Sequence, residues 1–494
     1  MNLQTCDLEH GTANTKQLPR RTRTLPEQAR SRRQHGGFHR SVPTCRCHQD
    51  LFVGLDFGTS GARAHVIQNG GKLEADFRQE YKEGGELDWA DAWQTALWQL
   101  LKRLDSVDKS RIGALAIDGT SSTCMLVNQD TLEVVSAPQL YNATQLTSSV
   151  QAVKEIAPPG HTATASTSAL CKMMTWHNTG TWQKAEVERK RPCLLHQADW
   201  LAALLHGQTR HSDWNNALKL GFDPALPGYP PWLMSQPYAG MLPRHVHAPG
   251  EAIATITAEA AARTGLPADC LICAGTTDSN AAFIAAGVTQ PGEAVTSLGS
   301  TLAVKLLSET RVDRAEYGIY SHRLGDAWLV GGASNTGGAV LKQFFSSAKL
   351  KELSARIDAS SPSPLQYYPL TCPGERFPIN DPALEPCMEP RPQGDADFLH
   401  GLLEGIARVE AQAYGRLEEL GATHLTKVVT AGGGAANEAW TNIRSRVLGV
   451  PVIASPHGEA AHGAALLAQQ GFHEHRRLHA HTTCLNPRGG GGIL

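Results

Sequence analysis

The sequence predicts an α/β fold of two similar domains around a central cleft. Short apolar segments alternate along the chain with segments in which apolar residues recur at helical spacing, and this alternation is typical of α/β proteins. Two of the apolar segments lead into turns of glycine and hydroxyl residues, at residues 58–61 and 299–301. Two related units of this kind indicate a duplicated domain with a cleft between the copies.

The composition is that of an ordinary globular protein. The chain has 494 residues, of which 41% are apolar and 19% charged, and its length alone favours about three domains. The formal net charge is −2, so no global charge excess indicates nucleic acid as a partner. No apolar run approaches the ~20 residues that cross a bilayer, so we expect no membrane partner. The composition leaves monomer and homodimer open.

The cysteines favour free thiols in a reducing compartment. There are 11 of them, an odd and scattered set that does not resemble a disulfide framework. Cys270 and Cys273 form a C-x-x-C pair, but the residues between them, Leu271 and Ile272, predict a buried strand. We therefore interpret both cysteines as core residues, because a zinc site would need further ligands nearby.

Residues 1–49 differ in composition from the rest of the chain. Acidic residues are few, hydroxyl residues are frequent, and no apolar core of a secretory signal is present. Arginine-rich leaders of this kind are typical of organelle transit peptides, and the lack of a strong amphipathic helix favours the chloroplast stroma, with processing near residues 42–47. The alternative is a basic disordered tail on a cytoplasmic protein. The arginines are Arg20, Arg21, Arg23, Arg30, Arg32, Arg33, Arg40 and Arg46.

The folded part begins with a predicted hairpin. Apolar residues 51–57 and 62–68 predict its two strands, and the short turn between them closes it. Helical spacing predicts a helix over residues 89–104, and residues 112–117 predict the next strand. We expect an N-terminal domain at 50–268, a second domain at 269–472 and a flexible tail at 473–494.

The second domain repeats this plan. Residues 271–274 predict its first strand, and a second hairpin encloses the turn at 299–301. Later elements are a helix over 398–409, a strand over 427–430, a loop at 432–434 and a helix over 436–448. Small residues at 458–465 predict a closely packed helix, which we expect near the loop at 432–434.

Glycine and hydroxyl turns suit the binding of phosphate. In the first turn, Asp56 ends a strand, and Gly58, Thr59, Ser60 and Gly61 follow. Glycines let backbone amides approach a phosphate, hydroxyls add donors, and a carboxylate can orient water on Mg²⁺. A tight hairpin with a capping Asp is the structural alternative.

The second turn has the same chemistry in the same hairpin context, through Gly299, Ser300 and Thr301. Because two such turns in one chain are less expected by chance than one, the pair favours a phosphate site. A third loop, which contains Gly433 and Gly434, places amides at a helix start and suits an adenosine or its α-phosphate. A packed turn explains that loop equally well.

Asp278 is the candidate catalytic base. It follows a predicted strand and precedes a predicted helix. Phosphoryl transfer to an alcohol needs a group that accepts the hydroxyl proton, and a carboxylate at a strand end beside the cleft could do so. In isolation, a helix N-cap explains the same residue.

Together these motifs resemble the FGGY carbohydrate kinase family, which has the actin-like ATPase (ribonuclease H-like) fold. The resemblance extends over about residues 51–470, and two further segments, 170–173 with Trp176 and 401–406, resemble the family signatures. It implies that Asp278 is the catalytic base and binds the sugar, and that Asp56 lies where metal, phosphate and sugar meet. It implies ATP and Mg²⁺ as cofactors. The implied ATP-binding residues are Gly58, Thr59, Ser60, Gly299, Ser300, Thr301, Gly433, Gly434 and Asn437.

Within the family, residues 118–123 indicate the substrate. Xylulokinases and gluconokinases carry a Gln-x-His-Gly motif after the strand at 112–117, whereas this chain has Asp-Gly-Thr-Ser-Ser-Thr. That segment is similar to the plant and cyanobacterial D-ribulokinase-like branch, which implies that Ser121 joins Asp56 and Asp278 in binding the sugar. The resemblance implies a small ketose and ATP as partners, with D-ribulose as the expected acceptor. D-xylulose is the alternative, and a non-catalytic ATP-binding sensor or scaffold is an alternative of another class.

Overall fold

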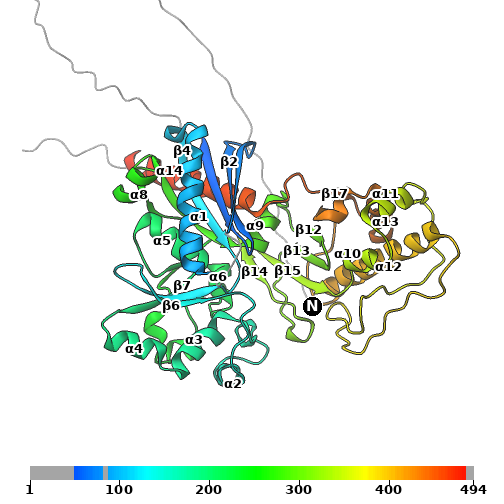
Figure 1. Ribbon diagram of the computed structural model, residues 1–494, viewed down its shortest axis with the longest axis horizontal. Coiled ribbons are helices and arrows are strands. Elements are labelled where there is room, and N and C mark those ends of the chain that lie inside the picture. The colour runs from blue at the N-terminus through cyan, green and yellow to red at the C-terminus, as the bar shows by residue number, and fades with distance from the viewer. Residues whose placement is uncertain (1–48, 82–86, 485–494) are drawn as a thin grey trace, which may run out of the picture. The chain divides into compact units, whose positions relative to one another are not determined.

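The structure is a computed structural model that describes residues 49–81 and 87–484. The expected transit segment therefore lies outside the described residues, apart from residue 49. Two six-stranded mixed sheets dominate the described part, and Figure 1 shows them together with their helices. The alternation of strands and helices that the sequence predicts is confirmed.

The first sheet has the strand order β10-β11-β4-β1-β2-β3. All seven residues of β1 are buried, as expected for a central strand covered on both faces. β1 pairs antiparallel with β2, which confirms the first hairpin, and parallel with β4. The strands are β1 (Leu51–Phe57), β2 (Gly61–Gln68), β3 (Leu73–Glu80), β4 (Ile112–Gly119), β10 (Ala252–Thr255) and β11 (Leu271–Thr277).

The second sheet has the order β14-β15-β13-β12-β16-β17. β12 pairs antiparallel with β13, which confirms the second hairpin, and parallel with β16. This order repeats the arrangement of β2, β1 and β4 in the first sheet. The strands are β12 (Glu293–Leu298), β13 (Leu302–Ser308), β14 (His322–Leu324), β15 (Ala327–Ser334), β16 (Lys427–Ala431) and β17 (Val452–Ala454).

Smaller elements complete the structure. A three-stranded sheet contains β5 (Cys124–Asn128), β6 (Val134–Gln139) and β7 (Pro192–His196), and a two-stranded sheet contains β8 (His211–Asp213) and β9 (His245–His247). The helices of the first half are α1 (Trp89–Arg103), α2 (Thr147–Ile156), α3 (Ala169–Asn178), α4 (Thr181–Val187), α5 (Gln197–His206), α6 (Trp214–Leu218), α7 (Pro231–Met234), α8 (Ala258–Thr264) and α9 (Asp278–Ala285). Those of the second half are α10 (Gly338–Phe344), α11 (Ser347–Ser354), α12 (Asp395–Glu419), α13 (Glu438–Leu448) and α14 (Ala460–Cys484).

The expected domain boundary after residue 268 is wrong. β11 belongs to the first sheet, where it pairs parallel with β4 from Leu271 opposite Ala114 onward. The apolar side chains of β11 are buried there, and burial of apolar surface from both faces stabilises a strand in a central position. The tail was expected to begin at residue 473, but α14 continues to Cys484, so residues 473–484 are helical.

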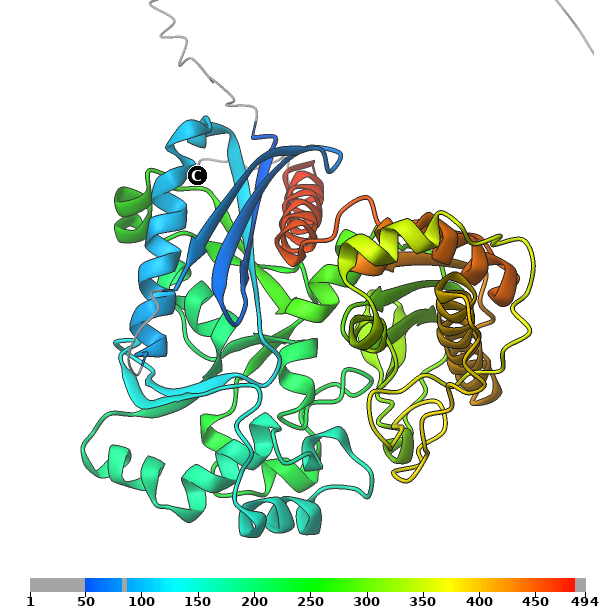
Figure 2. The ribbon, with the colours of Figure 1, turned by 45° about the vertical axis from the view of Figure 1, so that its right-hand side comes forward.

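α14 packs against the first sheet and α9, not against the loop at 432–434 as expected. The helix contacts β1, β4 and β11, and Figure 2 shows it beside these strands. Glycines allow the backbones to approach closely: a Cβ at Gly54 would lie 2.0 Å from the Ala461 carbonyl oxygen, and one at Gly463 would lie 1.9 Å from the Ala281 carbonyl oxygen. Close helix packing is therefore the confirmed role of the small residues at 458–465.

The structure also bears on the cysteine and membrane expectations. Cys270 and Cys273 are buried and unbonded, and burial raises the pKa of both thiols, of Cys273 to about 12, so they are core residues as predicted. Across the described ranges, no helix is both long and apolar enough to span a membrane.

Candidate active site

Three carboxylates meet at the carboxyl ends of neighbouring parallel strands in the first sheet. Asp56 on β1 stands directly opposite Asp118 on β4, and Asp118 stands opposite Thr276 on β11. Asp278 follows β11 as the first residue of α9. Because parallel strands carry their carboxyl ends to one edge of a sheet, three acidic residues that are far apart in the sequence share one site.

Burial raises the pKa of each of the three carboxyl groups. Burial raises the pKa of Asp56; Asp118 and Arg63 oppose the rise, and Asp278 adds to it. Burial, followed by the charges of Asp56 and Asp278, raises the pKa of Asp118 well above its usual value. Like charges gathered in a partly desolvated place hold protons to higher pH than isolated carboxylates do, which is the condition that a general base requires.

Asp278 combines access with a fixed orientation. Its side chain is partly buried, and its Oδ1 accepts a hydrogen bond of 2.6 Å from the Ser279 amide. Burial raises its pKa, while this hydrogen bond and the charges of Lys305 and Lys219 lower it. The Ser279 amide occupies Oδ1, so Oδ2 is the oxygen that can accept a proton from a substrate.

Asp118 was not among the site residues that we predicted from the sequence, although it is the first residue of the segment 118–123 that indicated the substrate. Its side chain is fully buried, and within the described ranges neither carboxyl oxygen receives a hydrogen bond from an N–H or O–H group. The neighbouring Asp56 can share a proton with it. The signal available in the sequence was its place at the end of an apolar strand, like Asp56.

The acidic pair is suited to Mg²⁺. Asp118 has carboxylate lone pairs without a donor, and hard oxygen ligands are those that Mg²⁺ prefers, usually one or two carboxylates together with water and phosphate oxygens. No group of three or more His, Cys, Asp or Glu side chains is arranged to hold a metal in the part of the chain that the structure describes. The pair therefore fits a cation that is shared with a bound phosphate rather than one in a closed protein cage.

Polar side chains from two sheets surround the Asp278 end of the cluster. Asn215 donates from Nδ2 to Thr276 Oγ1 over 3.0 Å, and its Oδ1 lies 3.3 Å from Nδ1 of His322, which comes from β14. Lys305, on β13, donates to the Ser279 carbonyl and to Asn280. The sequence analysis did not identify these residues, because their common location depends on contacts between distant segments.

The turn after β4 is fixed by hydrogen bonds to two buried side chains, Gln197 and Lys172. Gln197 Oε1 accepts from the Thr120 amide at 2.9 Å and from the Thr120 hydroxyl at 3.0 Å. The buried ammonium of Lys172 on α3 donates to the Ser122 carbonyl at 2.7 Å and to the Leu140 carbonyl at 2.6 Å. Ser121, the predicted sugar ligand, is partly buried within this turn and follows Asp118 by three residues. Lys172, which lies in the signature-like segment 170–173, therefore fixes the turn through these carbonyl groups.

The first glycine turn is a closed hairpin. The Gly58 amide donates to the Gly61 carbonyl at 3.1 Å, and the Tyr81 hydroxyl donates to the Gly58 carbonyl at 3.4 Å. Thr59 and Ser60 are exposed at the tip. The turn directly follows Asp56, so it lies at the same strand end as the acidic cluster.

The second glycine turn and the loop at 432–434 are packed together. The Gly338 amide donates to the Gly299 carbonyl at 2.9 Å, which joins the turn to the start of α10. A Cβ at Gly432 would lie 2.8 Å from the Leu298 carbonyl oxygen, and Gly432 has φ of +86°, where side chains are strained. These glycines are therefore required by close backbone packing.

A cavity of about 1190 Å³ opens beside these two turns. Among the residues predicted to bind ATP, Gly299, Ser300, Gly433, Gly434 and Asn437 line it. Its wall also contains Lys342 and Lys351. Thr301, Gly58, Thr59 and Ser60 are not part of its lining. The cavity is somewhat larger than the roughly 300–1,000 Å³ of common ligand sites, and it combines glycine amides, lysines and an apolar wall.

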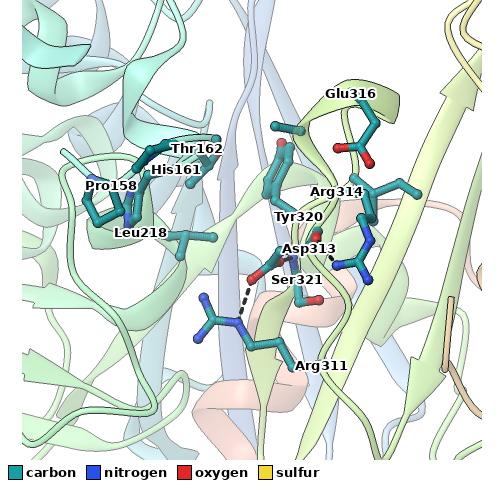
Figure 3. Close-up of a pocket in the computed structure, with 14 residues that line it drawn as sticks. Pro158, His161, Thr162, Leu218, Arg311, Asp313, Arg314, Glu316, Tyr320 and Ser321 are labelled. Atoms are coloured by element: carbon teal, nitrogen blue, oxygen red, sulfur yellow. Dashed lines mark hydrogen bonds and ion pairs between the residues drawn. The ribbon is translucent and has the colours of Figure 1, made fainter. Parts of the chain in front are cut away.

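A second cavity, of about 380 Å³, lies between the segment at 158–162 and the segment at 311–321. Figure 3 shows His161 and Arg311 on its walls. Arg311 is paired with both Asp223 and Asp313, so its charge is already balanced. This cavity joins segments on either side of α9 in the sequence and contains none of the predicted site residues.

A carboxylate cluster at the strand ends of one sheet, and a cavity lined by glycine turns beside a similar sheet, define an ATP-dependent phosphotransferase of the actin-like fold. Residues 294–470 match the FGGY family of carbohydrate kinases, C-terminal domain. This part of the chain is therefore the C-terminal domain of an FGGY carbohydrate kinase, and the chain is a phosphotransferase with an alcohol group as acceptor.

Known relatives agree with this assignment. The chain is 24% identical over 461 residues to a xylulose kinase of Bacillus subtilis, covering 85% of this chain and 88% of the relative. The crystal structure of xylulose kinase from Rhodospirillum rubrum is similar with a TM-score of 0.70 at 20% identity, covering 88% of this chain and 98% of that one. Plasmodium falciparum glycerol kinase with ADP has a TM-score of 0.73 at 13% identity, covering 90% and 93%. These two structures support the fold.

Proposed function

We propose that this kinase transfers the γ-phosphate of ATP to the terminal hydroxyl of a ketopentose, with D-ribulose as the preferred acceptor and D-ribulose 5-phosphate as the product. The observation that carries the proposal is the end of β4. There an acidic residue, Asp118, and the hydroxyl turn at 120–123 lie beside Asp56 at one sheet edge. A ketose presents several hydroxyls, and fixed polar groups recognise them through hydrogen bonds.

In this mechanism Asp278 is the base. Its Oδ2 accepts the proton of the terminal sugar hydroxyl while the sugar oxygen forms a bond to the γ-phosphorus and the bond from that phosphorus to the ADP oxygen breaks. Asp56 and Ser121 bind and orient the sugar. Mg²⁺, held by Asp56 with Asp118 beside it, would neutralise charge on the phosphates. The glycine turns at 58–61 and 299–301 offer amides and hydroxyls to the phosphates, and the cavity of about 1190 Å³ takes the nucleotide.

D-xylulose is the second candidate acceptor. It is favoured by the names of the relatives, since those from Bacillus subtilis and Staphylococcus epidermidis are both called xylulose kinase. The fold and the mechanism would be the same for both sugars. Differences in sugar contacts of about 1–3 kcal/mol would separate the two acceptors by one to two orders of magnitude.

The deciding experiment is a steady-state assay of ADP release from the full chain with Mg-ATP and a panel of D-ribulose, D-xylulose, L-ribulose and glycerol. We expect the highest kcat/KM with D-ribulose. A higher value with D-xylulose would transfer the proposal to that sugar. Tight ATP binding without turnover of any acceptor would instead support a non-catalytic sensor or scaffold.

The role of Asp278 is tested with Asp278→Asn. We expect kcat to fall by about 10²–10⁴-fold, since that is what a positioned general base contributes, with the KM for ATP nearly unchanged. Asp326→Asn is the matched control, because Asp326 is exposed and pairs with Arg323 at 3.6 Å. Wild-type turnover in Asp278→Asn would remove the assignment.

We also propose that the chain acts in the chloroplast stroma, on the basis of the arginine-rich, acid-poor composition of residues 1–49. A fusion of these residues to a fluorescent reporter tests it. Plastid fluorescence is the expected result, and a uniform cytoplasmic signal would contradict the proposal.

A further inference from the structure

One lysine connects the two sheets at the proposed base. Lys305 lies on β13 of the second sheet, and its ammonium donates to the Ser279 carbonyl at 2.7 Å and to Asn280 Oδ1 at 3.0 Å. Both acceptors are in the first turn of α9, immediately after Asp278. The second sheet therefore contacts the backbone that carries the base.

The sheet leaves room for this side chain. Lys305 stands opposite Val295 on β12 and Gly331 on β15, so no charged residue faces it from its own neighbouring strands. A Cβ at Gly331 would lie 3.2 Å from Lys305 Cγ. Because the position opposite has no side chain, the lysine stem can run across β15 toward α9.

The charge of Lys305 is not neutralised by an ion pair. Within the described ranges, no carboxylate lies within 4.0 Å of its Nζ, and the groups that face it are Asp278, Lys219 and His322. Burial lowers the pKa of Lys305 to about 8, Asp278 opposes this fall, and Lys219 adds to it. Burial and both lysines lower the pKa of His322, which therefore stays neutral.

Two polar atoms of residues that flank Asp278 have no hydrogen-bond partner in the described part of the chain. Nδ2 of Asn280 and Oγ1 of Thr277 are buried without a hydrogen bond in the described structure. Asn280 thus uses its oxygen to hold Lys305, which turns its amide group and leaves the nitrogen uncommitted. A buried polar group without a partner is costly, and in a native structure it indicates strain, a catalytic role or a bound water or ion.

We propose that Lys305 is a positioning residue for phosphoryl transfer, which fixes the first turn of α9 against β13 and keeps Asp278 ionised and aligned toward the sugar hydroxyl. The inference rests on the proposed role of Asp278 as the base. In this proposal a residue of the second sheet, Lys305, assists the base that follows a strand of the first sheet. A lysine that only held the two sheets together would have no effect on the pH dependence of turnover.

The charge gives the proposal a distinctive pH signature. As the pH rises through about 8, Lys305 loses its proton, so the activity of the wild type should fall along an alkaline limb. Arginine stays charged far above this range, so in Lys305→Arg the limb should move up by about 1 pH unit or more. In Lys305→Met the pKa of Asp278 is no longer lowered by the ammonium, so the acidic limb of kcat/KM should move to higher pH.

The experiment measures kcat and KM of the full chain from pH 5 to 10 with the best acceptor of the panel. We expect Lys305→Met to lose kcat by at least about 10-fold, with the KM for ATP nearly unchanged, and Lys305→Arg to retain activity without the limb near pH 8. Lys427→Met is the matched control, since Lys427 lies on the same sheet and pairs with Glu293 at 2.8 Å. Its profile should match the wild type.

Two results would overturn the proposal: Lys305→Met with wild-type kcat, or Lys305→Arg with an unchanged alkaline limb. The arginine variant decides the question if the methionine variant does not fold. If the wild type turns over no acceptor, the proposed function fails, and hydrogen exchange of the ligand-free protein then tests the tether. Faster exchange over residues 278–285 in Lys305→Met would support it, and unchanged exchange would refute it.

Discussion

Gly54→Ala should destabilise the first sheet sharply. Gly54 is in the middle of β1, where a Cβ would lie 2.0 Å from the Ala461 carbonyl oxygen and 2.2 Å from the Ala465 amide nitrogen. Both atoms belong to the backbone of α14, so no side-chain rotation can relieve the clash. Either β1 or α14 must shift by about 1.5 Å to restore an ordinary contact.

Overpacking of this kind costs about 1–3 kcal/mol in cores, and the rigid obstacle places Gly54→Ala at about 3 kcal/mol. The unfolding entropy is about 2.1 cal/mol/K per residue, so for a compact unit of roughly 430 residues each kcal/mol lowers Tm by about 1 °C, and Tm should fall by about 3 °C. Since β1 carries Asp56, we also expect kcat/KM to fall.

Thermal unfolding followed by calorimetry measures this effect, and Gly415→Ala is the control. Gly415 lies in α12, and a Cβ there would meet nothing within 4 Å, so alanine should stabilise that helix by about 0.5–1 kcal/mol. If Gly54→Ala unfolded within 1 °C of the wild type, with Gly415→Ala behaving as expected, the close packing of α14 on β1 would be refuted; this threshold is about a third of the expected fall in Tm.

Two other predictions concern the sugar turn and acid stability. Lys172→Met removes the lysine donor from the Ser122 carbonyl and from the Leu140 carbonyl, of which the second keeps the Ala143 amide as a donor. Loss of the partner of a buried carbonyl costs about 1–3 kcal/mol. The KM for the sugar should rise while that for ATP stays the same, and equal changes in both would contradict the role of Lys172. Burial lowers the pKa of His206 to about 3, so between the ordinary pKa of 6.5 and that value only the unfolded chain binds the proton. Stability should therefore fall as the pH falls through this window, and His206→Asn should lose less Tm between pH 7 and pH 5 than the wild type does; an identical loss would show that His206 does not contribute.

The local elements were predictable from the sequence. β1, β2, β12 and β13 were expected from short apolar runs on either side of glycine turns, and the long helix α12 from apolar residues at helical spacing. These signals are local, because a strand or a helix imposes its own period on the residues that it buries. Gly299 and Ser300 of the second glycine turn line one cavity together with Gly433 and Gly434, and their role in binding ATP stays a prediction.

The placement of two elements was not predictable. The sequence assigned β11 to the second domain because it follows a long irregular stretch, yet it lies in the first sheet beside β4. α14 is far from β1 in the sequence, and only the paired contacts of Gly54 and Gly463 show where it packs. Strand order and helix docking depend on which apolar surfaces meet, and the period of a segment does not encode its partner.

By itself the sequence determined the strand–turn chemistry, the candidate base Asp278 and the glycine turns for phosphate, because each of these is written in consecutive residues. Only the tertiary structure decided that Asp118 stands beside Asp56 and that Lys305 reaches the first turn of α9. Both contacts join segments that are distant along the chain. They exist because parallel strands carry their carboxyl ends to one edge and because the sheet leaves space opposite a glycine, and neither condition can be seen in a single stretch of sequence.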